Sequence, residues 1–208
     1  MRAQESYDRV AAEYARRIAG ELEHKPRDRE LLERFAREVR ANLEHLVCDL
    51  GCGPGHVARF LHDLDVPVVG IDLSDGMVDE ARRLNPDIPF RQGDMRALDV
   101  PDGSFTGIVA FYSILHVPRE EVTAALREMR RVLLPGGLLL LTFHIGHEVR
   151  HSDEFFEVPV DLDFVFFEVE EMEGYLRDAS FTQIESIQRD PYPDVEVQTR
   201  RAYIFART

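Results

Sequence analysis

A glycine-rich loop constrains the fold of this chain more than any other feature. It reads Asp49-Leu50-Gly51-Cys52-Gly53-Pro54-Gly55-His56, and it lies between the apolar run 46–50 and a helical segment expected over 57–64. Glycines at such a junction let the backbone turn tightly and let a ligand approach the main chain. The order strand, glycine loop, helix therefore predicts a ligand site at the end of the first strand.

The details of this loop argue against a dinucleotide as the ligand. The dinucleotide fingerprint is G-x-G-x-x-G, whereas this loop reads G-x-G-x-G and places His56 where the third glycine of the fingerprint belongs. The acid Asp49 enters the loop, where it would repel a pyrophosphate. A ligand with a positive centre and no phosphate fits better.

Two further acids indicate which groups the ligand carries. Asp72 ends the second apolar run, about 20 residues after the first glycine, where an acid accepts hydrogen bonds from both hydroxyls of a ribose. Asp94 follows the third run, where a carboxylate accepts from an adenine amino group. The alternatives are an acid that favours a helix N-terminus for Asp72 and a turn-forming acid for Asp94.

Short apolar runs alternate with amphipathic helices through the middle of the chain. This order predicts a parallel sheet with helices on both faces. A helix over 168–179 and two strand-like segments without a helix between them close the chain, so these last two strands should pair antiparallel. The expected strands are 46–50, 66–71, 88–91, 107–112, 138–143, 182–188 and 195–206, and the expected central helices are 57–64, 74–84 and 120–134.

Three regions follow from this pattern. Residues 1–45 form a helical cap, with one helix that carries Tyr7, Tyr14 and Ile18 on one face and a second helix over 27–43. Residues 46–208 form the main domain. Within it, 145–167 is an insertion rich in phenylalanine, histidine and acids, interpreted as a flap or small hairpin near the site.

Composition excludes several classes of protein. The chain has 39 acidic and 25 basic residues, a formal net charge of −14, which disfavours a nucleic-acid-binding surface. Two cysteines exclude a disulfide-rich secreted scaffold. The N-terminus lacks the apolar region of a signal peptide, and the longest apolar run is too short to span a bilayer. We expect a soluble cytoplasmic protein without membrane or nucleic-acid partners, as a monomer or homodimer.

At this point the chain resembles the class I S-adenosylmethionine-dependent methyltransferases, in the broad group that acts mostly on small molecules. The matching stretches are VCDLGCGPGH, VVGIDLSDGMVDEAR, FRQGDMRALDVPDGSFTGIVAFYSILHV and RRVLLPGGLLLLTF, in the family's order and spacing. The resemblance implies a Rossmann-like, doubly wound α/β fold: a seven-stranded sheet, mostly parallel with an antiparallel C-terminal strand, and a helical N-terminal cap. It also implies S-adenosyl-L-methionine as cofactor, methyl transfer by direct in-line displacement, and S-adenosyl-L-homocysteine as product.

The same resemblance implies a role for each matching residue. The methionine part of the cofactor is expected on the loop, the ribose hydroxyls on Asp72, and the adenine against Leu73, with Asp94 accepting from its amino group beside Met95. The main chain from Phe111 to Ser113 is expected to approach the methionine amino group. The complete predicted cofactor set is Asp49, Gly51, Cys52, Gly53, Asp72, Leu73, Met77, Asp94, Met95, Phe111 and Ser113.

Several residues keep two interpretations. His116 lies just after the fourth strand and is either a general base for a hydroxyl acceptor or a polar wall. Tyr7 and Tyr14 either pack within the cap or cover the cofactor. His144 and Phe155 are candidates for the substrate pocket or lid. The histidines 144, 147 and 151 have no helical context for metal binding, and Cys48 and Cys52 lack further ligands, so no metal is predicted.

Two other functions remain open beside a small-molecule methyltransferase. A protein that binds the cofactor without catalysis would keep the same loop and acids. A nicotinamide-dependent oxidoreductase is disfavoured by the absent third glycine and by Asp94.

Overall fold

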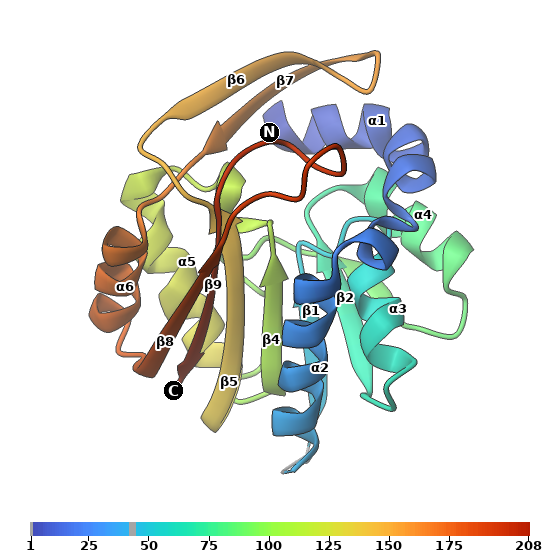
Figure 1. Cartoon of the computed structure of the whole chain (residues 1–208). Coiled ribbons are helices and arrows are strands. Elements are labelled where there is room, and N and C mark those ends of the chain that lie inside the picture. Colours follow the sequence, from blue (N-terminus) through green and yellow to red (C-terminus); the bar gives the residue numbers. More distant parts are fainter. Residues whose placement is uncertain (1, 42–44) are drawn as a thin grey trace.

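A seven-stranded sheet forms the centre of the computed structural model, which describes residues 2–41 and 45–208 (Figure 1). Its strand order is β3-β2-β1-β4-β5-β9-β8. The pairs from β3 to β5 are parallel, and β9 is antiparallel to both of its neighbours, which confirms the predicted fold class. The strands are β1 Leu46–Leu50, β2 Val68–Asp72, β3 Phe90–Gln92, β4 Phe105–Phe111, β5 Leu133–His144, β8 Thr182–Arg189 and β9 Arg201–Arg207.

Helices cover both faces of this sheet. Leu139 and Leu141 of β5 pack toward α5 and α6, whereas Leu138 and Leu140 pack in the opposite cluster with α2, α3 and α4. Alternation along a strand therefore builds two separate cores. The helical segments are α1 Arg2–Ile18, η1 Glu21–His24, α2 Pro26–Arg40, α3 His56–His62, α4 Asp75–Leu84, η2 Ile114–His116, α5 Arg119–Val132 and α6 Val169–Asp178.

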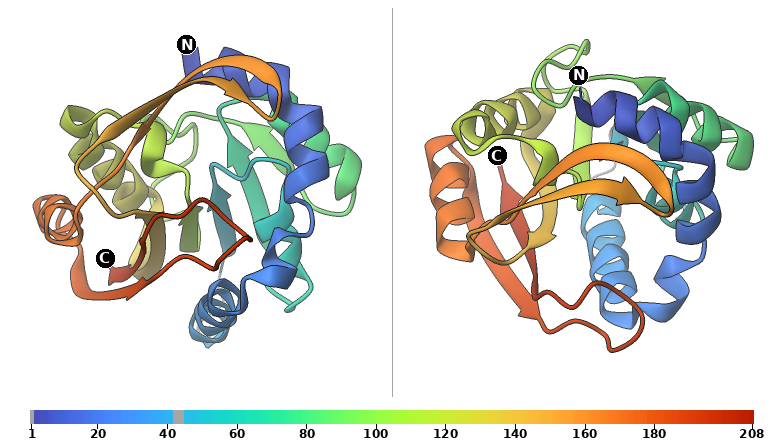
Figure 2. Two further views of the ribbon diagram at one scale, coloured as in Figure 1. Left: turned by 45° about the horizontal axis from the view of Figure 1, so that its top comes forward. Right: turned by 90° about the horizontal axis from the view of Figure 1, so that it is seen from above.

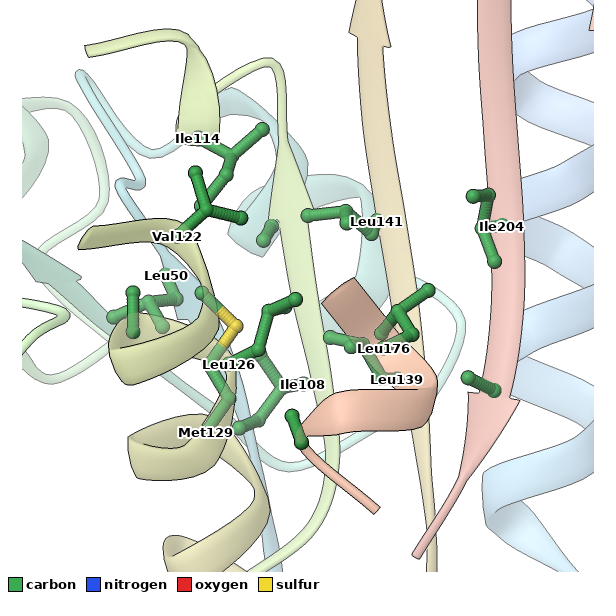
Figure 3. Close-up of a cluster of buried hydrophobic side chains, with 14 of the residues drawn as sticks. Leu50, Ile108, Ile114, Val122, Leu126, Met129, Leu139, Leu141, Leu176 and Ile204 are labelled. Carbon is green, nitrogen blue, oxygen red and sulfur yellow. The ribbon is translucent and has the colours of Figure 1, made fainter. Parts of the chain in front are cut away.

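The core between the sheet and α5 contains the largest cluster of buried apolar side chains (Figure 3). Ile108 of β4 and Leu139 of β5 meet Leu126 and Met129 of α5, and all four are fully buried. Leu176 of α6 lies on the same side of β5. Truncating one such leucine to alanine costs about 2–5 kcal/mol, so this layer anchors the strands whose ends form the site.

Three boundaries differ from the prediction by more than two residues. The last strand begins at Arg201 instead of 195, and residues 190–200 form a loop. Within 195–200 the Thr199 N–H donates to the Val197 carbonyl of the same loop, and the Glu196 side chain is buried against Arg201. The strand predicted from 138 already begins at Leu133, directly after α5. The second cap helix ends at Arg40, and the rest of its predicted range includes 42–44, outside the described residues.

The segment 145–167 contains a β-hairpin of β6 Val149–Phe155 and β7 Val158–Val165. Phe156 and Glu157 form its tip, both with positive φ. The hairpin lies across the carboxyl edge of the sheet, next to α1 (Figures 1 and 2). Its Val160 and Leu162 pack on Val10 of α1, so cap and hairpin form one cover over this edge.

No described helix is both long and apolar enough to cross a bilayer.

Candidate active site

The glycine loop adopts backbone conformations that only glycine takes without strain. Gly51, Gly53 and Gly55 have φ values of 73°, 51° and 82°. A Cβ atom on Gly51 would lie 2.2 Å from Cβ of Ser113, whose hydroxyl donates to the Leu50 carbonyl over 2.7 Å. The ends of β1 and β4 are thus in contact, and the loop brings its main chain to the edge of the sheet.

Asp72 lies at the end of β2, where its carboxylate receives two backbone N–H groups. Gly53 donates to Oδ2 over 2.8 Å and Ser74 donates to Oδ1 over 2.9 Å. Burial raises the pKa of this carboxyl, and the two N–H donors oppose that rise. Each carboxylate oxygen has a second acceptor position, so Asp72 is tied to the loop and still able to receive a diol.

Asp94 follows β3 and is held by an ion pair. Nη2 of Arg96 lies 2.7 Å from its Oδ2, and Arg96 also pairs with Glu121. The hydrogen bonds from Arg96 lower the pKa of Asp94. The carboxylate is therefore ionised at neutral pH and acts only as an acceptor.

A cavity of about 580 Å³ collects most of the predicted residues at one place. Its wall contains every predicted cofactor residue except Asp49, together with Tyr7, Tyr14 and His116. The predicted residues in this wall are Gly51, Cys52, Gly53, Asp72, Leu73, Met77, Asp94, Met95, Phe111 and Ser113.

Asp49 lies beneath the loop, with 1 % of its surface exposed. Its Oδ2 accepts a hydrogen bond from the N–H of Ala58 over 2.9 Å, in the first turn of α3. Burial raises the pKa of Asp49 to about 7. Its observed contact is with the start of α3, so Asp49 supports the loop from below.

A second cavity of about 1170 Å³ adjoins the first. The predicted pocket residues His144 and Phe155 line this second cavity and not the first. The two cavities share part of their walls, so a ligand in one is next to a ligand in the other. The shared lining residues are Tyr7, Tyr14, His56, Phe111 and Tyr112.

Tyr7 and His116 form a hydrogen-bonded pair at the first cavity. The Tyr7 hydroxyl lies 2.7 Å from Nε2 of His116, and Nδ1 of His116 lies 2.9 Å from the Asp163 carbonyl oxygen. A carbonyl only accepts, so Nδ1 carries the proton. Burial lowers the pKa of His116 to about 4, so the ring is neutral and its Nε2 accepts from Tyr7.

The cap is attached to the cofactor side of the sheet through Asp8. Its Oδ1 accepts from the Ser74 hydroxyl over 2.6 Å and from the Gly76 N–H over 3.0 Å. Ser74 is the N-cap of α4, and its hydroxyl oxygen accepts from the N–H of Met77. Tyr14, one turn and a half further along α1, lies over Gly53.

The three histidines 144, 147 and 151 are held apart by separate partners. His144 contacts the Thr199 hydroxyl, His147 lies near Glu168, and His151 lies near Asp163. In the described ranges, no three histidine, cysteine or acidic side chains are grouped to hold a metal ion. Both cysteines are buried free thiols, and burial raises the pKa of each.

Comparisons with known proteins agree with this geometry. A family model described as a methyltransferase domain matches residues 47–137, the stretch that carries the loop, Asp72 and Asp94. The matched stretch covers less than half of this chain, and the relatives and solved structures that resemble the chain include S-adenosylmethionine-dependent methyltransferases. A demethylmenaquinone methyltransferase of Beutenbergia cavernae is 40 % identical over 95 residues, which cover 46 % of this chain and 39 % of that protein. This chain thus spans less than half the length of that relative.

Solved structures share the fold at low identity. A methyltransferase from Methanosarcina mazei superposes on this one with a TM-score of 0.70 and 18 % identity, over 78 % of this chain and 91 % of that chain. The cyclase SpnF does so with a TM-score of 0.67 and 21 % identity, over 86 % of this chain and 80 % of that chain. Because the fold also occurs in a protein named for cyclisation, the reaction must be argued from the site.

Sequence reasoning missed a group of buried charges beside the second cavity. Lys25 lies 2.6 Å from Glu21 and 3.7 Å from Glu196, and Arg201 lies 3.1 Å from Glu196. Glu196 and Arg201 side chains are each only 3 % exposed. Glu21 and Lys25 lie near one end of the chain, whereas Glu196 and Arg201 lie near the other, so no local motif joins the two pairs.

His56, at the start of α3, was also missed as a site residue. Its Nε2 lies 2.9 Å from Oε1 of Glu21. Hydrogen bonding to His56 and the nearby charges of His56 and Lys25 lower the pKa of Glu21 to about 2 despite its burial. Nδ1 of His56 is buried without a hydrogen-bond partner among the described residues. A polar atom left in this state beside a ligand cavity marks a position that a ligand or water completes.

Proposed function

We propose that this protein transfers a methyl group from S-adenosylmethionine to a small-molecule acceptor by direct in-line displacement. The observation that carries the proposal is the pair of adjoining cavities, one bearing Asp72 and Asp94 at neighbouring strand ends and the other large enough for a separate molecule. The volume of the first cavity, about 580 Å³, lies within the range of about 300–1,000 Å³ that is usual for small-molecule sites.

The first cavity fits the cofactor in charge as well as in shape. Its described lining has five acids, Asp72, Asp94, Glu120, Asp161 and Asp163, against the two bases Arg96 and Arg119. S-adenosylmethionine carries a sulfonium and an ammonium group, so an acidic lining suits it. The glycine loop leaves its main chain accessible, since a Cβ on Gly53 would meet nothing closer than Tyr14 at 3.8 Å.

The residues that would hold the cofactor follow from their places in this wall. Asp72 would accept from the ribose hydroxyls, and Asp94 from the adenine amino group. Leu73, Met77 and Met95 would pack on the adenine. The main chain of residues 111–113 would face the methionine amino group, and His56 lines the same cavity.

S-adenosylmethionine supplies a methyl group that is already activated by its sulfonium. The protein's own contribution is to hold the acceptor in line at near-attack distance. Tyr7 on α1 and Asp163 on β7 both bind His116, so the cap and the hairpin close over the junction of the two cavities. This cover excludes water from the transfer.

His116 reaches the cavity through Tyr7. A proton released by an acceptor hydroxyl would pass to the Tyr7 oxygen while Tyr7 passes its own proton to Nε2. With a pKa of about 4, His116 is a weak base at neutral pH. The site is therefore better suited to an acceptor that is already ionised, and His116 holds Tyr7 in place.

The relatives' names are in keeping with a small-molecule acceptor. They include a demethylmenaquinone methyltransferase, a phosphoethanolamine N-methyltransferase and a malonyl-acyl-carrier-protein O-methyltransferase. Two of these names specify different nucleophilic atoms, nitrogen and oxygen, so the names support the reaction class and leave the acceptor open.

The test is formation of S-adenosylhomocysteine by the purified protein with a panel of phenols, carboxylic acids, thiols and amines. Product that appears only when an acceptor is present supports the proposal. Cofactor binding without turnover for every acceptor class would instead favour a protein that binds the cofactor without catalysis.

A further inference from the structure

The second cavity differs from the first in the sign of its charged lining. Its described wall contains five bases, Arg16, Arg17, Lys25, Arg150 and Arg201, against four acids, Glu21, Glu23, Asp194 and Glu196. The first cavity has more acids than bases, as does the whole chain with its net charge of −14. A wall with an excess of bases in so acidic a protein favours an anionic ligand over a cationic one.

Four of these five bases lie over aromatic rings of the same wall. Lys25 and Arg201 each lie 6.0 Å from the ring centroid of Tyr112. Arg17 lies 5.2 Å from the ring of Phe156, and Arg150 lies 4.6 Å from that of Phe166. Aromatic sites that bind ammonium ligands offer their ring faces to the ligand. Here the protein's own cations occupy those rings, which disfavours an amine as acceptor.

The wall is otherwise apolar. The hairpin contributes Phe155 and Phe164, and the 190–200 loop contributes Val195 and Val197, which are 45 % and 62 % exposed. The loop and the hairpin therefore both contribute apolar side chains to the wall of one cavity. Such a wall binds a ligand by burying the apolar part of that ligand.

His144 offers a hydrogen-bond donor in this wall. The Thr199 hydroxyl oxygen already accepts from Nη1 of Arg201 over 2.7 Å, and it lies 2.7 Å from Nδ1 of His144. We assign the Thr199 proton to this hydrogen bond with Nδ1, which places the single hydrogen of the neutral ring on Nε2. The ring stacks on Phe166 with centroids 5.1 Å apart, which holds its orientation.

We propose that the second cavity is the acceptor site and that it selects an acceptor with an apolar body and an anionic oxygen, which the Nε2–H group of His144 binds. The inference rests on the proposed function for the role of the cavity, while the charge preference stands on the cavity itself. Burial and the charge of Arg201 lower the pKa of His144 to about 3, so the ring is a neutral donor at neutral pH.

Two probes with the same ring system and opposite charge test this preference. Naphthoate and naphthylmethylamine are titrated calorimetrically into the full chain, with and without saturating S-adenosylhomocysteine, and acetate serves as the anion without an apolar body. We expect naphthoate to bind at least about tenfold more tightly than either of the others, a difference of about 1.4 kcal/mol. Binding should persist in the presence of S-adenosylhomocysteine.

Variants of one histidine test the donor. His144→Leu should weaken naphthoate at least about fivefold, whereas His144→Gln, which keeps an N–H group near Nε2, should stay within about twofold of the wild type. His147→Leu is the matched control, since His147 is 85 % exposed and lies outside the cavity wall.

The outcomes separate this inference from the proposed function. Equal or tighter binding of the amine, or unchanged naphthoate binding in His144→Leu, overturns the inference. Binding of S-adenosylhomocysteine without naphthoate also overturns it and leaves the proposed function standing. If the protein prefers naphthoate but does not bind S-adenosylhomocysteine, the preference of the second cavity for anions is supported and the proposed methyl transfer is contradicted.

Discussion

The Tyr7 hydroxyl donates a hydrogen bond to Nε2 of His116 over 2.7 Å, across 109 positions of sequence. Because Nδ1 of the same ring is bound to the Asp163 carbonyl, His116 joins the cap, the sheet edge and the hairpin. The pair lies at the junction of the two cavities, where the methyl group would be transferred.

Removing the imidazole should affect turnover more than cofactor binding. We expect His116→Ala to retain S-adenosylmethionine binding and to slow turnover at least about tenfold, because Tyr7 loses its acceptor and the cover loosens. Tyr7→Phe, which removes the same hydrogen bond, should slow turnover to a similar degree. Steady-state kinetics and calorimetry measure the two effects. Unchanged turnover in His116→Ala would remove His116 from the mechanism.

The lowered pKa of His116 makes a prediction about pH dependence. A histidine with a pKa of about 4 is neutral throughout the neutral range, so turnover should show no rise near the ordinary histidine pKa of about 6.5. A pH profile of kcat with wild type and His116→Ala measures this. A limb near pH 6.5 that His116→Ala abolishes would contradict the neutral state assigned to this ring.

Asp72 should be essential for binding of the cofactor. Loss of hydrogen bonds from a ribose diol to a carboxylate costs about 1.5–3 kcal/mol each, so Asp72→Ala should weaken S-adenosylmethionine at least about a hundredfold. Asp79→Ala on α4, with its side chain 78 % exposed, is the control and should bind normally. Equal affinities of the two variants, both folded, would contradict the role of Asp72.

Asp49 should make stability fall with rising pH. Its folded pKa of about 7 lies above its ordinary value of about 3.8, so the folded state holds the proton more tightly. That contribution to stability is present at low pH and is lost as the pH rises through about 4 to 7. The free energy of unfolding of Asp49→Asn should therefore rise, relative to that of the wild type, by up to about 4 kcal/mol between pH 4 and 8. Urea unfolding at several pH values measures this, and a pH-independent difference would contradict it.

The effect on stability of the close contact at Gly51 should be separable from the effect of its backbone conformation. Gly51→Ala places a Cβ 2.2 Å from that of Ser113 at a φ of 73°, whereas Gly136→Ala meets only the conformational cost at a φ of 76° in open space. We expect Gly136→Ala to lower the free energy of unfolding by about 1–2 kcal/mol and Gly51→Ala to lower it clearly more. Ser113→Gly should restore part of the Gly51→Ala loss in thermal unfolding. Equal losses at Gly51 and Gly136 would show that the contact with Ser113 carries no energy.

The sequence predicted the features that depend on local pattern. Alternation of apolar runs and amphipathic helices predicted the parallel sheet, and the positions of Asp72 and Asp94 after neighbouring runs placed both in one cavity wall. In each case, residues near in sequence determine the geometry.

The features that sequence reasoning missed depend on contacts between distant segments. Asp28 of α2 contacts Arg189 of β8 across 161 positions, and Glu196 is buried by bases from both ends of the chain. The prediction that the last strand begins at 195 was wrong for the same reason. The side chain of Glu196 is buried between the bases Lys25, Arg189 and Arg201, and residues 190–200 form the loop that holds it there. No periodicity in 190–200 carries that information.

Binding of the cofactor is the central claim, and calorimetric titration with S-adenosylmethionine and S-adenosylhomocysteine tests it most directly, with NADH as the control. The acidic first cavity, with Asp72 and Asp94 in its wall, predicts micromolar binding of the first two and no binding of NADH. A folded protein that binds neither methionine derivative, or that binds NADH instead, would contradict the assignment of both acids and with it the proposed function.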